Sequence, residues 1–198
     1  MNIAHYHAFR RDLESGRRAD AARSLGAFVE SFASLDEKIA WTRTFLEAGD
    51  FAGRIRHELY EIVVFPSLLH GYRLADPWSL WWLARTAQNL YASKPLWRQI
   101  DFVSAEALLR ALLAQQPDHR EARQALLSQL IAGLRYAMHE WPAGMLYGYD
   151  GATLEQCGKL GERLAEARRL DSEEVHANFL DAFALNLEEY AARLQPAR

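Results

Sequence analysis

One short run on a predicted helix contains residue types that could bind a metal or transfer a proton: His57-Glu58-Leu59-Tyr60-Glu61. In zinc proteases, two histidines four residues apart bind the metal, and the glutamate after the first histidine acts as the base. Here Glu61 stands in place of the second histidine. We therefore interpret His57 and Glu61 as a surface ion pair one helical turn apart; a metal shared by the two side chains is the alternative.

The other residue types that could bind a metal or act as a nucleophile are isolated. A carboxylate-bridged di-iron bundle needs two Glu-x-x-His pairs on different helices, and only Glu173 and His176 have this spacing. Cys157 shares a predicted helix face with Leu154 and Leu160, so we interpret it as a small apolar side chain. The sequence thus predicts no catalytic residue, no metal site and no cofactor.

Arg85 falls in the middle of a tryptophan-rich predicted helix. A guanidinium in such surroundings must be paired, or it must line a cavity or an open surface. Glu58 and Glu61, on the preceding helix, are natural partners across an antiparallel hairpin. We predict a structural salt bridge here. A ligand site at these three residues, with His57 or His139 as the acid–base group, is left open.

The segment HEWPAGMLYGYDGAT, residues 139–153, combines aromatic side chains with three glycines. The glycines permit backbone angles closed to other residues, yet the segment is too apolar for an unstructured linker. Ordered segments rich in Tyr, Trp and Met suit a protein interface. The predicted partner-binding residues are Trp141, Met145, Tyr147, Tyr149 and Asp150. The alternative is that the aromatic side chains plug the end of a helical stack.

The rest of the chain must position these residues, and its pattern is helical almost throughout. Apolar residues at helical spacing predict helices at about residues 3–14, 18–32, 35–48, 54–70, 77–92, 105–116, 119–140, 154–169 and 172–194. Pro66 lacks a backbone donor, so we expect it to kink or end the helix that contains it.

Polar residues mark several helix starts. Three runs have the spacing of a capping box, at residues 34–37, 153–156 and 171–174. Asp76 and Pro77 have the types of an N-cap and of a first helical residue. Helices are therefore expected to begin directly after each of these positions.

The helix at 77–92 is the most apolar of the chain. Trp78, Trp81 and Trp82, together with its leucines, cover most of its circumference, and a helix that is apolar nearly all round is usually buried. We predict an all-α fold of about nine helices, packed as helical hairpins around this buried central helix.

The composition is that of a folded domain. The chain has 198 residues, of which 50% are hydrophobic and 25% charged, too apolar and too evenly mixed for a disordered segment. With no long linker in the pattern, we expect one domain over residues 1–198, with N-terminal hairpins at 1–50 and a main body at 54–194.

Charge and hydropathy restrict the partners. The formal net charge is -3 and the basic residues are scattered, which disfavours a nucleic-acid groove. A single cysteine gives no sign of an oxidising compartment, and no run approaches the roughly 18 apolar residues of a membrane span. We expect a cytoplasmic protein that binds neither nucleic acid nor membrane.

Two stretches resemble tetratricopeptide repeats. LLAQQPDHREARQALL (112–127) resembles the junction between two such repeats, and EARRLDSEEVHANFL (166–180) resembles it more loosely. The junctions lie about 54 residues apart, where that family needs about 34, so the resemblance implies repeat-like helical hairpins without a true repeat array. The stretches at 58–91 and 139–153 are similar to small, uncharacterised bacterial helical proteins.

Compact acidic proteins of this size are common among the immunity proteins of bacterial toxin systems. The chain resembles them in size and charge, and this resemblance implies a protein-binding function. We expect a protein-binding module, most concretely an immunity or adaptor protein that blocks a partner by occupying its surface. The partner would be another protein, such as a toxin with a basic surface. A small-molecule-binding protein or an enzyme at Arg85, Glu58 and Glu61 is the alternative, and homo-oligomerisation is left open.

Overall fold

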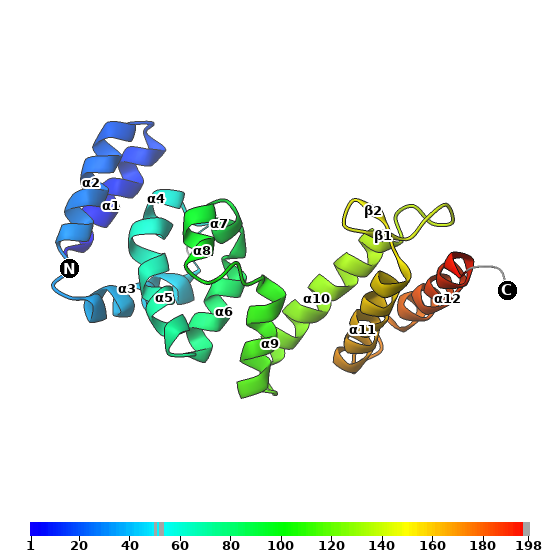
Figure 1. Cartoon of the computed structure of the whole chain (residues 1–198). Helices are drawn as coiled ribbons and strands as arrows, with labels where there is room; N and C mark the ends of the chain where they lie inside the picture. The colour runs from blue at the N-terminus through cyan, green and yellow to red at the C-terminus, as the bar shows by residue number, and fades with distance from the viewer. Residues whose placement is uncertain (50, 52–53, 196–198) are drawn as a thin grey trace. The chain divides into compact units, whose positions relative to one another are not determined.

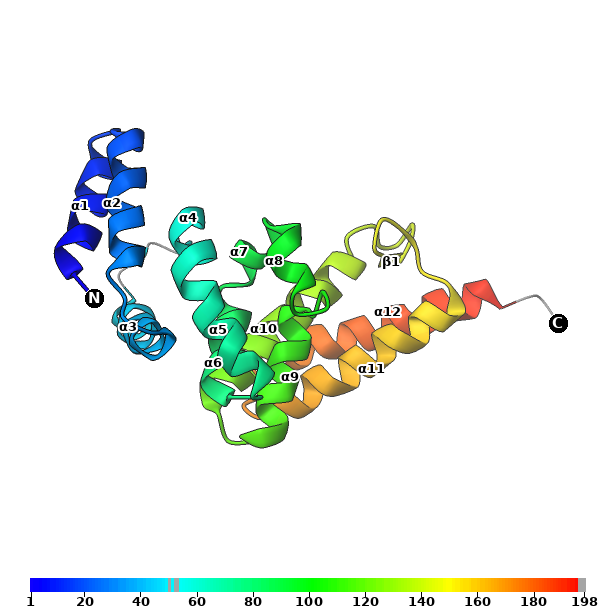
Figure 2. The ribbon, with the colours of Figure 1, turned by 60° about the vertical axis from the view of Figure 1, so that its left-hand side comes forward.

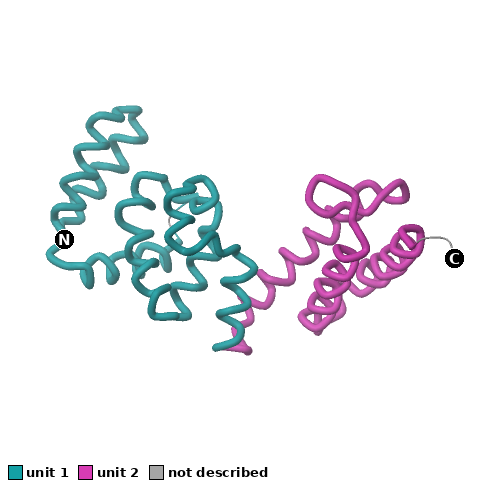
Figure 3. The backbone as a smooth tube through the Cα atoms, viewed as in Figure 1, with its two compact units in different colours: residues 1–115 teal, residues 116–198 magenta. Residues whose placement is uncertain are grey.

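The computed structural model describes residues 1–49, 51 and 54–195. These residues form helices and one short strand pair, which confirms the all-α prediction (Figure 1 and Figure 2). The contacts divide the chain into two compact units, Met1–Gln115 and Gln116–Arg198 (Figure 3). Within the first unit, the third helix packs against later helices, and the single domain expected over residues 1–198 stays a prediction.

The first unit is a succession of helices, and several pack in pairs. α1 packs against α2, α3 against α5, α5 against α6, and α6 against α9. The bounds of its helical elements are α1 (Ile3–Glu14), α2 (Arg18–Glu30), α3 (Leu35–Ala48), α4 (His57–Leu59), the π-helical turn η1 (Tyr60–Val64), α5 (Phe65–Arg73), α6 (Pro77–Arg85), α7 (Ala87–Tyr91), α8 (Lys94–Arg98) and α9 (Ala105–Gln115).

Two predicted helix starts in this unit are confirmed by their capping bonds. The Ser34 hydroxyl accepts a hydrogen bond from the Glu37 backbone N–H at 3.2 Å, at the start of α3. The Glu37 carboxylate reaches back to the N–H of Ala33, one residue before the cap. At the start of α6 the Asp76 carboxylate accepts from the backbone N–H of Ser79 at 3.1 Å.

Pro66 neither ends the helix nor leaves it regular. The turn before it, Tyr60–Val64, is π-helical, and α5 then continues to Arg73. Because proline has no N–H, the carbonyl four residues earlier, that of Ile62, loses its α-helical donor. The Lys38 ammonium lies 3.4 Å from this carbonyl and donates to it. The widened turn thus accommodates the proline within the helical path.

The tryptophan-rich segment is buried on one face only. Thr86 interrupts it between α6 and α7, and its hydroxyl donates to the Trp82 carbonyl at 2.6 Å. The indole rings of Trp78, Trp81 and Trp82 are half-buried rather than sealed in the core. The side chains that fill the core from this segment are those of Leu80, Leu83, Ala84, Ala87, Asn89 and Leu90.

The largest aromatic cluster of the first unit lies instead between α1, α2 and α3. Tyr6 contacts Trp41 edge-on, with ring centres 5.2 Å apart, and Trp41 stacks on Phe45 at 4.9 Å. Phe28, which is fully buried, lies 5.0 Å from Trp41. Offset and edge-on ring pairs of this kind add specific packing energy to the burial of apolar area.

The second unit packs three long helices around a leucine-rich core. Its helices are α10 (Arg120–Ala137), α11 (Leu154–Leu170) and α12 (Ala177–Leu194). α11 packs against both of the others. The Thr153 hydroxyl accepts from the Gln156 N–H while the Gln156 side chain accepts from the Thr153 N–H, which confirms the predicted capping box at the start of α11.

The last helix begins five residues later than expected. The Asp171 carboxylate accepts from the backbone N–H groups of Val175 at 3.0 Å and His176 at 2.7 Å, so it stabilises a turn instead of a helix start. Glu174 has a positive φ of 54°, which is incompatible with a right-handed helix at that residue. The prediction of a helix from residue 172 is therefore wrong.

Candidate functional site

The predicted partner-binding segment folds as a small β-hairpin. β1 (Leu146–Tyr147) pairs antiparallel with β2 (Asp150–Gly151), and Gly148 and Tyr149 form the turn between them. Gly148 has a φ of 71°, and two-residue hairpin turns commonly place glycine first because it adopts this angle without strain. Sequence reasoning missed the hairpin because each strand has only two residues, and Gly148 was its one signal.

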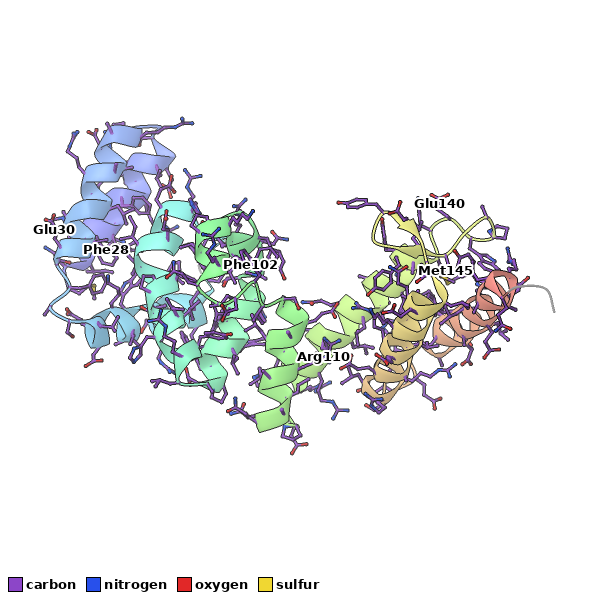
Figure 4. All side chains as sticks on the ribbon, viewed as in Figure 1. Phe28, Glu30, Phe102, Arg110, Glu140 and Met145 are labelled. Atoms are coloured by element: carbon purple, nitrogen blue, oxygen red, sulfur yellow. The ribbon has the colours of Figure 1, made fainter. Side chains whose placement is uncertain are left out.

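The base of the hairpin is part of the core. The Met145 side chain, labelled in Figure 4, comes from the segment just before β1. It has 0% exposure, and Ala152 on the other side of the hairpin is also buried. The Ala152 N–H donates to the Met145 carbonyl at 2.6 Å, which joins the two ends. Met145 therefore anchors the hairpin in the core, and its side chain is not available to a partner.

Side chains from two helices hold the rest of the segment. The Tyr136 hydroxyl, from α10, donates to the Gly148 carbonyl at 2.5 Å. Arg193, from α12, donates to the Pro142 carbonyl at 3.0 Å, and its guanidinium lies 4.8 Å from the centre of the Trp141 ring. The half-buried Trp141 ring is thus fixed by a cation–π contact, and the segment has a defined shape.

The tip of the hairpin is the exposed part. Tyr149 is 98% exposed, Asp150 beside it is exposed, and Tyr147 is half-buried. The five residues predicted for partner binding therefore separate into a buried anchor, Met145, two half-buried rings and an exposed pair. Only the exposed pair and the outer edges of the two rings can meet another molecule.

Arg85 does not form the predicted salt bridge with Glu58 or Glu61 in the part of the chain that the structure describes. All three side chains are exposed. The Arg85 guanidinium lies 5.2 Å from the centre of the Trp81 ring and 5.6 Å from that of Trp82. Because the rings hold this charge at the surface, it keeps its contact with water and needs no buried partner.

The other residues considered for catalysis or metal binding, His57, His139 and Cys157, do not come together in one site among the described residues. His57 and Glu61 lie one helical turn apart at the surface, as predicted, with 3.5 Å between Nε2 and Oε2. His139 lies 3.8 Å from Glu140 and is well exposed. Burial raises the pKa of the Cys157 thiol, which makes it a poorer nucleophile, as its predicted apolar role implies. Among the described residues, no group of three or more His, Cys, Asp or Glu side chains could hold a metal ion.

Two cavities were not predicted, because each is lined by segments far apart in the sequence. One of them, in the second unit, has a volume of about 510 Å³ and lies between the start of α10 and the connection from α11 to α12. Its wall combines Arg120 and Arg123 with Glu173 and His176, so it carries both charge signs. The carboxylate of Asp171, also in the wall, is already satisfied by backbone N–H groups.

The cavity of the first unit has a volume of about 390 Å³ and is mainly apolar. It lies between α1, the end of α3 and the segment leading into α4. The residues that line it are Tyr6, Phe9, Arg10, Leu13, Glu14, Phe45, Phe51, Arg54, Ile55, Arg56 and Leu59.

No protein-family model, curated protein sequence or solved structure matches this chain. In the part of the chain that the structure describes, none of the helices combines the length and the apolar character needed to cross a membrane.

Proposed function

We propose that this chain is a protein-binding module whose contact surface is the tip of the β-hairpin formed by residues 146–151. The observation that carries the proposal is Tyr149, which is 98% exposed on a turn whose base is anchored in the core. Tyrosine provides a large, rigid contact area at a low cost in conformational entropy, and it is enriched among the residues that dominate interface energies.

The anchoring of the hairpin supports this use of Tyr149. The Tyr136 hydroxyl and the Arg193 guanidinium bond to backbone carbonyls of the segment, and Met145 is buried beneath it. A segment that is already ordered loses little conformational freedom on association, so more of the contact energy appears as affinity. A flexible loop of the same composition would lack this advantage.

Charge favours a basic partner. Asp150 stands next to Tyr149 at the exposed tip, and the second unit has 13 Asp and Glu residues against 9 Lys and Arg. Excess negative charge raises the association rate with a positively charged surface. The narrower form of the proposal is an immunity or adaptor protein that occludes the basic surface of a toxin.

The proposal is tested by crosslinking from single positions. A photoreactive phenylalanine analogue replaces Tyr149 in the full chain, expressed in the cells that naturally produce it. The matched control carries the analogue at Leu185, which is 68% exposed on α12 of the same unit. We expect one protein to be crosslinked from position 149 and not from 185, and to bind the purified chain as a stoichiometric complex.

Two results would count against the proposal. One is an equal set of crosslinked proteins from positions 149 and 185, because that pattern reports chance collisions. The other is a crosslinked protein that forms no complex with the purified chain.

A further inference from the structure

The apolar cavity of the first unit is independent of the hairpin and has the character of a binding site. Its lining includes apolar side chains that are almost fully buried, among them Phe9, Phe45, Ile55 and Leu59. Ligand pockets are typically concave, mostly apolar, of about 300–1,000 Å³, and carry a few polar groups that fix orientation. The volume of about 390 Å³ lies at the lower end of this range.

The floor is stiff because its rings belong to the aromatic cluster of α1, α2 and α3. Tyr6 contacts Phe45 edge-on at 6.1 Å, and Phe45 stacks on Trp41 behind it. On the other side Phe45 lies 5.5 Å from Phe51, ring centre to ring centre. A floor braced in this way keeps its shape when empty, so an apolar ligand would enter a cavity that is already formed.

The charged residues of the lining have mostly one sign. Arg10, Arg54 and Arg56 line the cavity together with a single carboxylate, that of Glu14. Arg54, Arg56 and Glu14 are exposed, whereas the apolar floor residues are buried. The cavity therefore combines an apolar interior with an excess of positive charge toward solvent.

We propose that this cavity binds a small amphiphilic carboxylate, with its apolar body against the aromatic floor and its carboxylate facing Arg54 and Arg56. A guanidinium presents paired N–H donors that match the planar carboxylate. Glu14 in the same lining disfavours a doubly charged head such as a phosphate dianion. The modest volume favours a single-chain acid over a lipid with two chains.

Calorimetric titration of the full chain with decanoate tests this proposal. Decanoate is expected to bind more tightly than hexanoate, by about fourfold for each methylene that the cavity accommodates. The uncharged decanol is expected to bind about tenfold more weakly than decanoate, because it lacks the charge-assisted bonds to the arginines.

Variants separate the role of the arginines from that of the apolar floor. The double variant Arg54→Gln/Arg56→Gln is expected to weaken decanoate binding about tenfold and to leave decanol binding unchanged. The matched control Arg98→Gln removes an exposed arginine of the same unit outside the cavity and should change neither affinity. Leu13→Trp fills the cavity from the α1 wall and should abolish the binding of both ligands.

Three results would overturn the proposal. Decanoate binding no tighter than decanol binding would show that the arginines do not recognise the head group. Unchanged decanoate affinity in the double variant would show the same. Unchanged affinity in a Leu13→Trp protein with native circular dichroism and melting temperature would place the ligand elsewhere. None of these results bears on the hairpin, so they leave the proposed function untouched.

Discussion

At the scale of single residues, Met145 and Tyr149 show how little residue type says about role. Both are apolar residues of one short segment, and the sequence suggested the same role for both. The structure buries Met145 completely and exposes Tyr149 almost completely. Neither periodicity nor composition could separate them, because Met145 lies at the base of the hairpin and Tyr149 in its turn, and the sequence pattern did not reveal the hairpin.

Met145→Ala is expected to destabilise the protein by about 2–5 kcal/mol, because it removes buried apolar volume and leaves a cavity. Tyr149→Ala is expected to change the free energy of unfolding by less than about 0.5 kcal/mol, since an exposed ring contributes little to the folded state. Urea denaturation of both variants measures this difference. Similar destabilisation by the two substitutions would contradict the division of the segment into anchor and tip.

Tyr60 is the most deeply buried titratable hydroxyl of the first unit and bonds to the Thr86 hydroxyl at 3.1 Å. Burial raises the pKa of Tyr60 above its usual value of about 10, and the bond to Thr86 offsets this only in part. The unfolded chain therefore loses this proton at a lower pH than the folded chain does. The contribution of the protonated Tyr60 hydroxyl to the free energy of unfolding is therefore complete below about pH 10 and is lost as the pH rises further.

We predict a pH-dependent difference between the wild type and Tyr60→Phe. Above about pH 10, the wild-type free energy of unfolding should fall by up to about 1.4 kcal/mol per pH unit more than that of the variant. Urea denaturation of both proteins between pH 9 and pH 11 gives this difference directly. A difference that stays constant over this range would show that Tyr60 ionises as readily in the folded chain as in the unfolded one.

At the scale of elements, the sequence predicted what depends on local bonds. The caps at Ser34, Asp76 and Thr153 are confirmed, because each joins groups only three residues apart. The π-helical turn before Pro66 and the late start of α12 were missed. The first involves a donor from α3, and the second a turn that Asp171 stabilises against the local helical pattern. Such competition between local and tertiary preferences is not visible in helical periodicity.

α5 and α6 approach each other closely at Gly71. A Cβ at Gly71 would lie only 2.8 Å from the Ser79 Cβ and closer still to its hydroxyl, so the two helices would have to separate. We expect Gly71→Ala to destabilise the protein by about 1–3 kcal/mol, as overpacking of a tight contact does.

Gly26→Ala is the matched control, because Gly26 lies within α2 and a Cβ there would meet nothing within 4 Å. It should stabilise the protein by about 0.5–1 kcal/mol through helix propensity. Thermal unfolding of both variants measures the two effects. Stabilisation by both substitutions would contradict the close approach of α5 and α6 at Gly71.

At the scale of the whole molecule, the all-α class followed from the sequence, whereas the two compact units and the cavities did not. The break between Gln115 and Gln116 falls at the end of the helix predicted at 105–116, and the short connection that follows looks like any other turn in the pattern. The apolar cavity unites residues from α1, α3 and the segment before α5, so its existence depends on tertiary packing. The sequence singled out residues 139–153, which include Tyr149, as a partner-binding segment, and this role stays a prediction.

Because the contacts divide into two units, a core substitution in one of them should act locally. We expect Met145→Ala to increase amide hydrogen exchange in α10, α11 and α12 by about thirtyfold or more, as a loss of about 2 kcal/mol implies. The protected amides of α3, α5 and α6 should keep their wild-type rates. Mass spectrometry of peptic fragments resolves the two regions. An equal increase in both would show that the chain unfolds as one cooperative unit.

The affinity of the partner crosslinked from position 149 tests the proposed protein-binding role most directly. The purified partner is titrated with the wild-type chain, with Tyr149→Ala and with Leu185→Ala, which removes an equally apolar exposed side chain of the same unit. We predict that Tyr149→Ala weakens binding by about thirtyfold or more, as the loss of a dominant interface residue does, and that Leu185→Ala leaves it unchanged. Equal affinities for all three proteins would contradict the assignment of the hairpin tip as the contact surface.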